Sequence, residues 1–403
     1  MIEGRVTDGL QALLSASEEE KKARGTWYTP QEIFRQPASW QKTYEICAER
    51  RNDLRQFLRE SGIGIGAEEK TRPVVFLVGA GTSDYIGRTL TLLLRRLWEC
   101  EVWAVPSTDL LTNLEDLVFA ERPYLFVSFS RSGDSPEGWA VVEAALQKYP
   151  KIRHLLITCN QKGQMAAACE KAPERAFVLA LDETANDRGL AMTSSFTNMV
   201  VAGQCLAHVS SPDDYRTIFS MLKQAGERFL ESAPDVAAAI AEEGFSRVCF
   251  VASGALRGVA KESALKLLEL TAGKIQTLSE STMGLRHGPM SALDGDTVFV
   301  IFLSRDLRRR NYELDLLREV NRKRLGKLRV VVTPEFTDDL SGLADHVFSL
   351  HAPDLNDDYR APVDVMLSQL LGLFCSLRMG LQPDCPSPNG AIARVVSNVK
   401  IYS

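Results

Sequence analysis

The sequence predicts an α/β protein with two tandem, doubly wound parallel sheets and an N-terminal helical extension. Apolar runs of strand length alternate with helical segments of about ten to fifteen residues, which is typical of parallel sheets. The pattern occurs twice, because a shift of 173 positions carries Val75 onto Val248 and Phe126 onto Phe299. At both places an apolar run turns into a Gly- or Ser-rich loop, which indicates two related α/β units.

Each predicted element follows from local pattern. In the first unit we expect the strands VVFLVG, EVWAVP, YLFVSF, HLLITC and AFVLAL. In the second unit we expect RVCFVA, TVFVIFL, LRVVVT and HVFSL, followed by an apolar helix. The predicted parts are 1–70 for the helical extension, 71–210 for the first sheet domain, 211–243 for a helical connector, 244–385 for the second sheet domain and 386–403 for a tail. The tail is rich in Pro, Gly and Asn, so it is either loose or laid over a site, and we favour the second.

Composition narrows the functional classes. The chain has 403 residues, of which 45% are hydrophobic and 25% charged, with a formal net charge of -5. This mild acidity argues against nucleic-acid binding. The eight cysteines contain no CxxC pair, as expected in a reducing compartment. The polar start MIEGRVTDGL does not resemble a signal peptide, and no apolar run is long enough for a membrane span. We therefore expect a cytoplasmic protein without nucleic-acid or membrane partners.

A small anion site is predicted where the first strand ends. Gly81, Thr82 and Ser83 follow VVFLVG in a tight turn that opens a helix. The dinucleotide fingerprint G-x-G-x-x-G fails, because its third glycine is replaced by Asp84. Backbone N–H groups and hydroxyls at a helix N-terminus suit a single phosphate. The alternative is an ordinary turn with a helix cap.

A second hydroxyl-rich loop follows the third strand. SFSRSGDSPEG contains four serines and one arginine, among them Ser130, Arg131, Ser132 and Ser135, and Pro136 suits the first turn of a helix. This is more than capping requires, and several neutral donors with one cation suit a dianionic phosphate. The carboxyl ends of parallel strands meet at one edge, so both loops are expected to bind one sugar phosphate. Arg131 alone could be a solvated surface charge.

Candidate catalytic groups lie in the second unit. Glu262, Lys266 and Glu269 form one charged stripe in the otherwise apolar helix GVAKESALKLLELTAG. The stripe either faces a cleft, where a glutamate serves as a general base, or is an exposed face with i,i+4 ion pairs. His287 lies in the turn of LRHGP before a strand, where it either shuttles protons or is a hydrogen-bonded loop residue. We treat the remaining histidines as structural: His154, His208, His346 and His351.

Together these motifs resemble a known family. GAGTSDYIG, SFSRSGDSPE, the ALKLLE helix and LRHGP look like the double sugar isomerase (SIS) domain, a flavodoxin-like fold that also forms the isomerase half of glucosamine-6-phosphate synthase. NDRGLAMTSSFTNMV, GLRHGPMSAL and PSPNGAIARVVSNVKIY are similar to the galactosamine-6-phosphate deaminase group, which is also labelled as tagatose-6-phosphate ketose/aldose isomerase. The resemblance covers roughly residues 70 to 403.

The resemblance implies roles for individual residues. The phosphate contacts fall on Ser83, Ser130, Arg131, Ser132 and Ser135. The base for proton transfer between C1 and C2 falls on Glu269, with Lys266 near the carbonyl end of the sugar and Glu262 as a further carboxylate. The ring-opening histidine falls on His287, which in the family reaches the site from a neighbouring subunit. A homo-oligomer, at least a dimer, is therefore expected.

Three departures from the synthase shape the expected activity. Arg131 replaces a glutamine, the segment between Glu269 and His287 is longer, and Arg394 stands where the synthase tail has a catalytic lysine. Gly81, Thr82 and Arg394 are further candidates for contact with the substrate or the tail. No glutaminase half precedes the two units, which favours release of ammonia over its use.

We therefore expect conversion of galactosamine 6-phosphate to tagatose 6-phosphate and ammonia. This chemistry needs neither a metal nor a redox cofactor, and no side-chain cluster has metal-ligand spacing. Three alternatives stay open: isomerisation of tagatose 6-phosphate, deamination of another amino-sugar phosphate such as glucosamine 6-phosphate, and a sugar-phosphate sensor without catalysis. A sensor is usually a single copy joined to a DNA-binding segment, whereas this chain has two copies.

Overall fold

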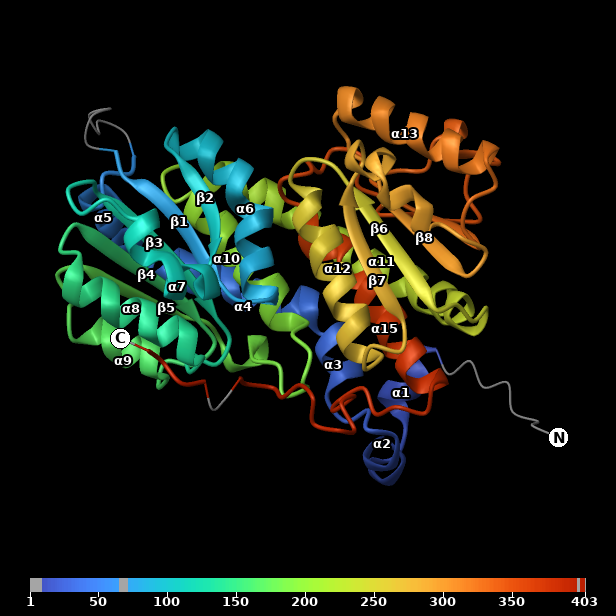
Figure 1. The fold of residues 1–403 in the computed structure, drawn as a ribbon, viewed down its shortest axis with the longest axis horizontal. Helices are drawn as coiled ribbons and strands as arrows, with labels where there is room; N and C mark the ends of the chain where they lie inside the picture. The colour runs from blue at the N-terminus through green and yellow to red at the C-terminus, as the bar shows by residue number, and fades with distance from the viewer. Residues whose placement is uncertain (1–8, 65–71, 397–398, 403) are drawn as a thin grey trace. The chain divides into compact units, whose positions relative to one another are not determined.

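The computed structural model describes residues 9–64, 72–396 and 399–402. The chain forms two compact units, each built around one parallel sheet (Figure 1). The first-sheet unit comprises Ala38–Asn186, Ser194–Phe219 and Ala393–Ser403, and the second-sheet unit comprises Met1–Pro37, Asp187–Thr193 and Ser220–Ile392. Among the described residues, no helix has both the length and the apolar character needed to cross a bilayer.

The first-sheet unit contains all five strands that the sequence predicts. They are β1 (Val74–Gly79), β2 (Val102–Pro106), β3 (Tyr124–Ser130), β4 (Ile152–Thr158) and β5 (Ala176–Ala180). All of them pair in parallel in the order β2-β1-β3-β4-β5, with Val78 opposite Ser128 in the central pair. The central strands are buried on both faces, which explains why β1 and β3 are continuous apolar runs.

Helices connect and cover these strands. They are α4 (Gln36–Glu49), α5 (Arg51–Glu60), α6 (Thr82–Trp98), α7 (Ser107–Leu117), α8 (Pro136–Lys148), α9 (Gln164–Glu170) and α10 (Ser194–Ala207). The strand order reverses direction between β1 and β3. In open α/β sheets this switch point is where ligands bind, outside the carboxyl ends of the strands.

The second-sheet unit repeats this arrangement. Its strands are β6 (Arg247–Ala252), β7 (Gln276–Ser281), β8 (Thr297–Phe302), β9 (Leu328–Thr333) and β10 (His346–Ser349). They are parallel in the order β10-β9-β8-β6-β7, which is the order of the first sheet with each strand in the corresponding place. The predicted fold class, α/β with two doubly wound parallel sheets, is therefore confirmed.

One strand was missing from the prediction. The expected second sheet had four strands, but the structure has a fifth, β7, with the sequence QTLSES. It pairs only with β6 and lies at the edge of the sheet, where most of its residues are half-buried. A polar sequence is stable there because one side of an edge strand is not covered by further strands.

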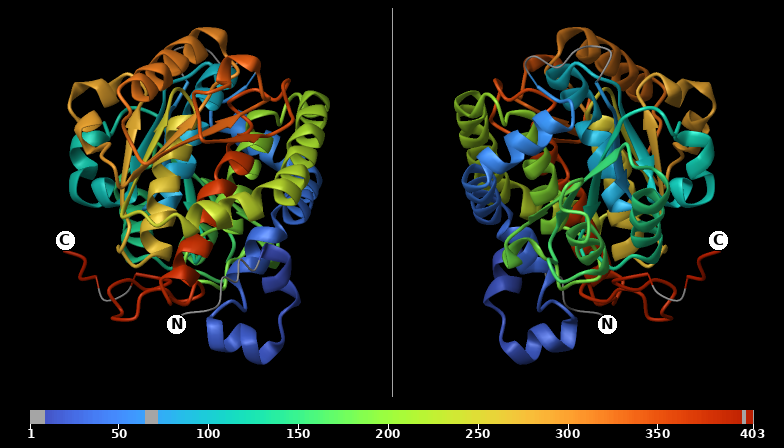
Figure 2. Two further views of the ribbon diagram at one scale, coloured as in Figure 1. Left: turned by 90° about the vertical axis from the view of Figure 1, so that its right-hand side faces the viewer. Right: turned by 90° about the vertical axis from the view of Figure 1, so that its left-hand side faces the viewer.

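The helices of the second-sheet unit include the N-terminal ones. They are α1 (Leu10–Ser15), α2 (Glu18–Arg24), α3 (Thr29–Phe34), α11 (Pro212–Glu242), α12 (Leu256–Leu270), α13 (Leu307–Arg322), α14 (Ala361–Asp364) and α15 (Met366–Arg378). Helices α1 to α3 form a small lobe, drawn in dark blue in Figure 2. The carboxylate of Asp384 fastens this lobe, accepting hydrogen bonds at 2.7 Å from the backbone N–H groups of Trp27 and Thr29. The N-terminal helices thus divide between the two units, with α4 and α5 beside the first sheet.

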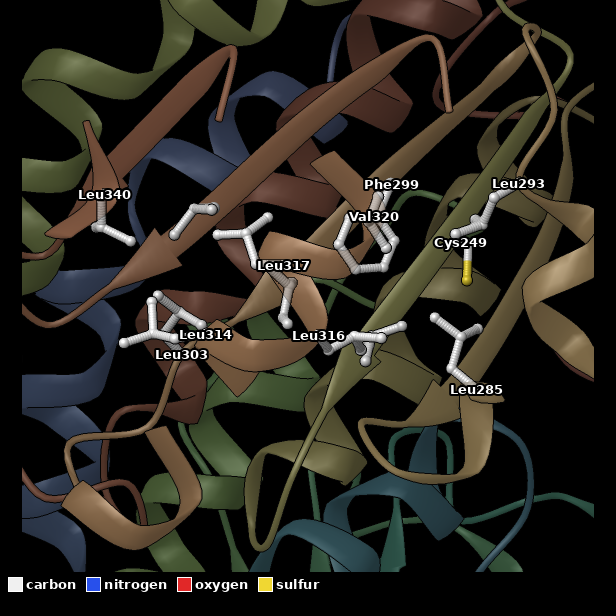
Figure 3. Close-up of a cluster of buried hydrophobic side chains, with 13 residues drawn as sticks. Cys249, Leu285, Leu293, Phe299, Leu303, Leu314, Leu316, Leu317, Val320 and Leu340 are labelled. Carbon is white, nitrogen blue, oxygen red and sulfur yellow. The ribbon is translucent and has the colours of Figure 1, made fainter. Parts of the chain in front are cut away.

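A compact apolar core fixes α13 on the second sheet (Figure 3). Leu316, Leu317 and Val320 of this helix are fully buried in one cluster with Phe299 and Ile301 of β8. Burying such side chains contributes about 1.5–3 kcal/mol each. The orientation of α13, and of every polar residue on its buried side, is therefore set by packing.

Candidate active site

The turn after β1 has the geometry of an anion-binding helix start. Gly81 has a φ of 55°, which glycine adopts without strain, and α6 begins at the next residue. Gly81 itself occupies the N-cap position, so neither Thr82 nor Ser83 is the capping group. Both hydroxyl residues lie in the first helical turn and are buried, with 4% and 6% exposure. The two hydroxyl groups are therefore not used for capping, and the anion site at this turn stays a prediction.

The loop after β3 is held in one conformation by its own side chains. Ser130 ends the strand, and its Oγ accepts a hydrogen bond from Gly133 N at 3.0 Å. Ser132 Oγ accepts one from Asp134 N at 3.1 Å. From the loop after β4, Asn160 Nδ2 donates to the carbonyl oxygen of Ser132 at 2.7 Å. These bonds shape the serine loop before any ligand is bound, which lowers the entropy cost of binding.

Ser135 and Pro136 connect this loop to α8. Pro136 is the first residue of the helix, as predicted, where its missing N–H costs no hydrogen bond. Ser135 is the N-cap residue but makes no side-chain capping bond. Because β1 and β3 are neighbours in the sheet, the turn after β1 and the serine loop leave the same carboxyl edge. We call these two segments the first carboxyl edge.

The C-terminal tail contacts this edge within the first-sheet unit. The Arg131 side chain donates a hydrogen bond to the carbonyl oxygen of Arg394. In turn, Arg394 Nη2 donates to Asn186 Oδ1 at 2.8 Å, in the segment after β5. Arg131 is only 6% exposed, so its interpretation as a solvated surface charge is wrong.

The charged stripe of α12 is buried and paired. Glu262 and Lys266 are both fully buried, with 3.4 Å between Glu262 Oε1 and Lys266 Nζ. Lys266 Nζ also donates to Glu269 Oε2 at 2.6 Å. Burial of charge is costly unless the charges are paired, and this lysine lies between two carboxylates. The alternative of an exposed face is therefore wrong.

Glu269 differs from its two partners in one respect. Its side chain keeps 23% exposure, whereas those of Glu262 and Lys266 have none. The helix packs against β6, β7 and α15, which covers the rest of the stripe. A carboxylate that contacts a buried cation on one side and solvent on the other can exchange a proton with a bound ligand. Of the three residues, Glu269 has the access that a general base requires.

His287 lies on a separate 3-10 turn of the second-sheet unit, Gly284–His287. It is exposed, while its neighbour Arg286 is paired with Glu319 at 2.7 Å, and its role as a proton shuttle stays a prediction. By contrast, His154 is buried in β4 against Phe126, and burial lowers its pKa to about 3. His154 is therefore a core residue of the first sheet, closed to solvent.

The segment between β5 and α10 is held by a buried acidic pair, Glu32 and Asp187, that the sequence interpretation missed. Glu32 of α3 accepts hydrogen bonds from the backbone N–H groups of Arg188, at 2.5 Å, and Gly189, at 3.3 Å. Burial and the nearby Asp187 raise the pKa of Glu32 to about 8. Asp187 in turn accepts bonds at 2.8 Å from the backbone and side chain of Thr193. These contacts fix the turn that leads into α10. They could not be predicted from the sequence, because Glu32 is a single glutamate in TPQEIF without a recognisable motif.

The predicted site residues thus form two groups. Those of the serine loop, the β1 turn and the tail lie in the first-sheet unit, and Glu262, Lys266, Glu269 and His287 lie in the second-sheet unit. Among the described residues, no group of three or more His, Cys, Asp or Glu side chains is suited to hold a metal ion.

Known proteins share this sequence and fold. The model of the SIS domain matches residues 241–373. The D-galactosamine-6-phosphate deaminase AgaS of Escherichia coli is 36% identical over 382 residues, which cover 94% of this chain and 96% of that protein. The crystal structure of tagatose-6-phosphate ketose/aldose isomerase from Escherichia coli has a TM-score of 0.83 and 33% identity, over 93% of this chain and 96% of that one. A glutamine–fructose-6-phosphate aminotransferase from Pyrobaculum aerophilum is 25% identical over 77% of this chain and 50% of that protein. Similarity over nearly the full length of both chains shows that this protein belongs to the AgaS family of SIS-domain proteins.

Proposed function

We propose that the protein is an amino-sugar-phosphate deaminase that converts galactosamine 6-phosphate and water to tagatose 6-phosphate and ammonia. The observation that carries this proposal is the similarity to D-galactosamine-6-phosphate deaminases, which extends over 94% of the chain. The site residues support it, since the chain has both a hydroxyl-rich anion loop and a buried Glu–Lys–Glu stripe.

The first carboxyl edge binds the phosphate in this proposal. Ser83, Ser130, Ser132 and Ser135 supply hydroxyl donors, and the start of α6 supplies backbone N–H groups. Arg131 adds a cation beside the loop, which strengthens binding of a dianion. Fixing the phosphate holds the opposite end of the open-chain sugar in one position, and this positioning is a large part of catalysis.

Glu269 performs the proton transfer. In the open-chain aldose it removes the proton from C2, and the electrons of that C–H bond form a C1=C2 double bond while the C1 carbonyl oxygen gains a proton. Return of a proton to C1 leaves an imine at C2. Lys266 Nζ lies 2.6 Å from Glu269 Oε2, and its positive charge stabilises the negative charge that develops beside C1.

Hydrolysis completes the reaction. Water adds to C2 of the imine, and the resulting carbinolamine expels ammonia as its C–N bond breaks. The product is the ketose 6-phosphate, with the oxygen of water as the new C2 carbonyl oxygen. His287 assists opening of the sugar ring at the start of the cycle. We propose that it acts in the site of a neighbouring subunit, so that the working enzyme is at least a dimer in the cytoplasm.

Aldose–ketose isomerisation is the second candidate function. The similarity to the tagatose-6-phosphate ketose/aldose isomerase structure favours it, at 33% identity. The same base moves the same proton, but the substrate has a hydroxyl group at C2 and no imine forms. The two activities therefore differ in their products and share their machinery.

Ammonia release separates these candidates. Purified protein is given galactosamine 6-phosphate, glucosamine 6-phosphate or tagatose 6-phosphate, and ammonia is measured with glutamate dehydrogenase while the sugars are identified by NMR. With galactosamine 6-phosphate we expect ammonia and ketose 6-phosphate to form in equal amounts. Aldose formation from tagatose 6-phosphate without any ammonia from either amino sugar would overturn the deaminase proposal. Faster release of ammonia from glucosamine 6-phosphate would show that glucosamine 6-phosphate is the preferred substrate. The proposed reaction, deamination, would stay the same.

A further inference from the structure

The second sheet has a carboxyl edge of its own, formed by the segments that follow β6 and β8. Because β6 and β8 are neighbouring parallel strands, these segments lie side by side in the second-sheet unit. We call them the second carboxyl edge. It occupies the place in its sheet that the serine loop and the β1 turn occupy in the first sheet. Its donors are the backbone N–H groups of Ser304 and Arg305 and the hydroxyl of Ser304.

A glutamate of the chain itself occupies this edge. Glu313 Oε2 accepts the backbone N–H of Ser304 at 2.6 Å, and Glu313 Oε1 accepts the hydroxyl of the same serine at 2.8 Å. The hydroxyl of Ser253, in the segment after β6, pairs with that of Thr282 at 2.7 Å. Glu313 has no exposure to solvent. Both oxygens of this carboxyl group thus accept donors of the loop after β8, as the oxygens of a bound anion would.

A second carboxylate completes the edge. Asp357, which is 3% exposed, accepts the backbone N–H of Arg305 at 2.8 Å and contacts Arg309 at 3.3 Å. Beside it the fully buried Arg360 donates to both carboxylate oxygens of Asp364, at 2.8 and 2.7 Å. Two consecutive backbone N–H groups of the loop therefore each bind a carboxylate of the same chain.

The first sheet has no carboxyl group at the corresponding position. The 173-residue shift that aligns β1 with β6 and β3 with β8 places Glu313 over Ala140 of α8. Ala140 is buried at 8% exposure, so the first unit has a methyl side chain at the position where the second unit has the side chain of Glu313. The two edges thus differ in two ways: the first has more serines, and the second is occupied by the side chain of Glu313.

We propose that the second carboxyl edge is an anion site permanently occupied by Glu313, and that removing this side chain opens it to phosphate or a small carboxylate. The chain then binds one phosphate group, at the first edge, although both sheets have the geometry for one. The occupant also fixes α13 to the loop after β8. The occupied edge lies in the second-sheet unit, and the count of one phosphate per wild-type chain rests on the phosphate site of the proposed function.

Chemical rescue of Glu313→Ala tests the proposal. The variant leaves the buried backbone N–H and the hydroxyl of Ser304 without their acceptor, so its Tm should fall by about 5–10 °C. Acetate or inorganic phosphate should then raise that Tm well above its value in chloride of equal ionic strength. Glu319→Ala is the matched control, because Glu319 lies on the same helix and only contacts Arg286 and Lys323 at the surface. Its Tm should respond to acetate no more than that of the wild type.

Equilibrium dialysis with labelled inorganic phosphate gives a second readout. We expect one phosphate per wild-type chain and two per Glu313→Ala chain. In the variant that also has Ser130→Ala and Ser132→Ala, the second-edge phosphate should remain while the first is lost. If Glu313→Ala does not fold, the dialysis is done with the wild type and Glu313→Gln. Each should bind one phosphate, because a side chain of the same length still fills the second carboxyl edge. Two phosphates per wild-type chain, or equal responses of Glu313→Ala and Glu319→Ala to acetate, would overturn the proposal.

Discussion

The two carboxyl edges show how one sheet arrangement serves two purposes. In the first, the hydroxyl oxygens of Ser130 and Ser132 accept from backbone N–H groups of their own loop, and among the described residues no bond uses their hydroxyl protons. In the second, the hydroxyl of Ser304 is already donated to Glu313. The first edge is prepared for an external anion, and the second is closed by an internal one. A fold therefore does not make a binding site, because the site depends on which donors remain unused.

The units also differ in where they place charge. The helix after β1 begins with hydroxyl residues, whereas the helix after β6 carries the buried stripe of Glu262, Lys266 and Glu269. The corresponding helix of each unit thus has a separate role in our proposal. One binds the phosphate, and the other transfers the proton.

The largest expected effect comes from the proton-transferring helix. Glu269→Gln should lower kcat by roughly 10³-fold or more while the Kd for sugar phosphate changes only a few fold, because the amide cannot accept the C2 proton. Glu319→Gln, a surface glutamate of the same unit, should leave kcat unchanged. Steady-state kinetics and calorimetric binding are the measurements, and turnover retained by Glu269→Gln would remove it as the base.

Next in size is the contrast between the serines of the two edges. Ser130→Ala together with Ser132→Ala should raise KM by roughly 10- to 100-fold, since each hydroxyl is expected to donate to a charged phosphate. Ser304→Ala should lower Tm instead and leave KM within about twofold, because its hydroxyl serves Glu313. Both sets are compared by kinetics and thermal unfolding. An unchanged KM in the double variant would exclude the serine loop from the site.

A smaller effect is expected from the tail. Arg394→Ala should raise KM several-fold, because it removes the side-chain bond to Asn186 that holds the tail, whose carbonyl oxygen accepts from Arg131 beside the serine loop. Asn186→Ala should have a similar effect, since Asn186 accepts the hydrogen bond of Arg394 at 2.8 Å. The double variant should then be no worse than either single one. Additive losses in KM would show that the two residues act separately.

The smallest effect concerns pH. Burial raises the pKa of Glu313, with a further contribution from the nearby Asp357 and opposing hydrogen bonds from Ser304 and Ser253. Above pH 4.5 the unfolded chain releases this proton while the folded chain keeps it, so the contribution of Glu313 to stability falls until the pH passes the raised pKa. Relative to Glu313→Gln, the wild type should therefore lose stability as pH rises through that window. Urea unfolding of both proteins at several pH values measures the difference, and a wild type that gains stability would contradict it.

Much of the fold could be predicted because its signals are local. The central strands are apolar on both faces, and the shift that carries Val75 onto Val248 holds for the ends of β1 and β6. Strand β7 could not be found in this way, since an edge strand with the sequence QTLSES has neither an apolar run nor a strict alternation.

Part of the candidate site could be predicted because its residues also lie in local sequence motifs. Ser130, Ser132 and Glu269 lie in short motifs whose residue types reveal the chemistry. Glu313 and Glu32, however, lie in segments whose sequences are typical of a solvent-exposed helix face. Their burial follows from the packing of α13 and α3. Whether a charged side chain of a helix is solvated or enclosed depends on distant partners, and sequence spacing does not report them.

A crystal structure with a bound 6-phosphate of a sugar alcohol would test the division between the two units most directly. Such a ligand has the phosphate and carbon chain of the substrate but no carbonyl group, so it is not turned over. Our account predicts the phosphate oxygens within hydrogen-bonding distance of Ser130 and Ser132, and C2 within reach of the Glu269 carboxylate from the same chain or a neighbouring one. A phosphate bound beside Ser304, or a C2 atom far from every Glu269, would contradict it.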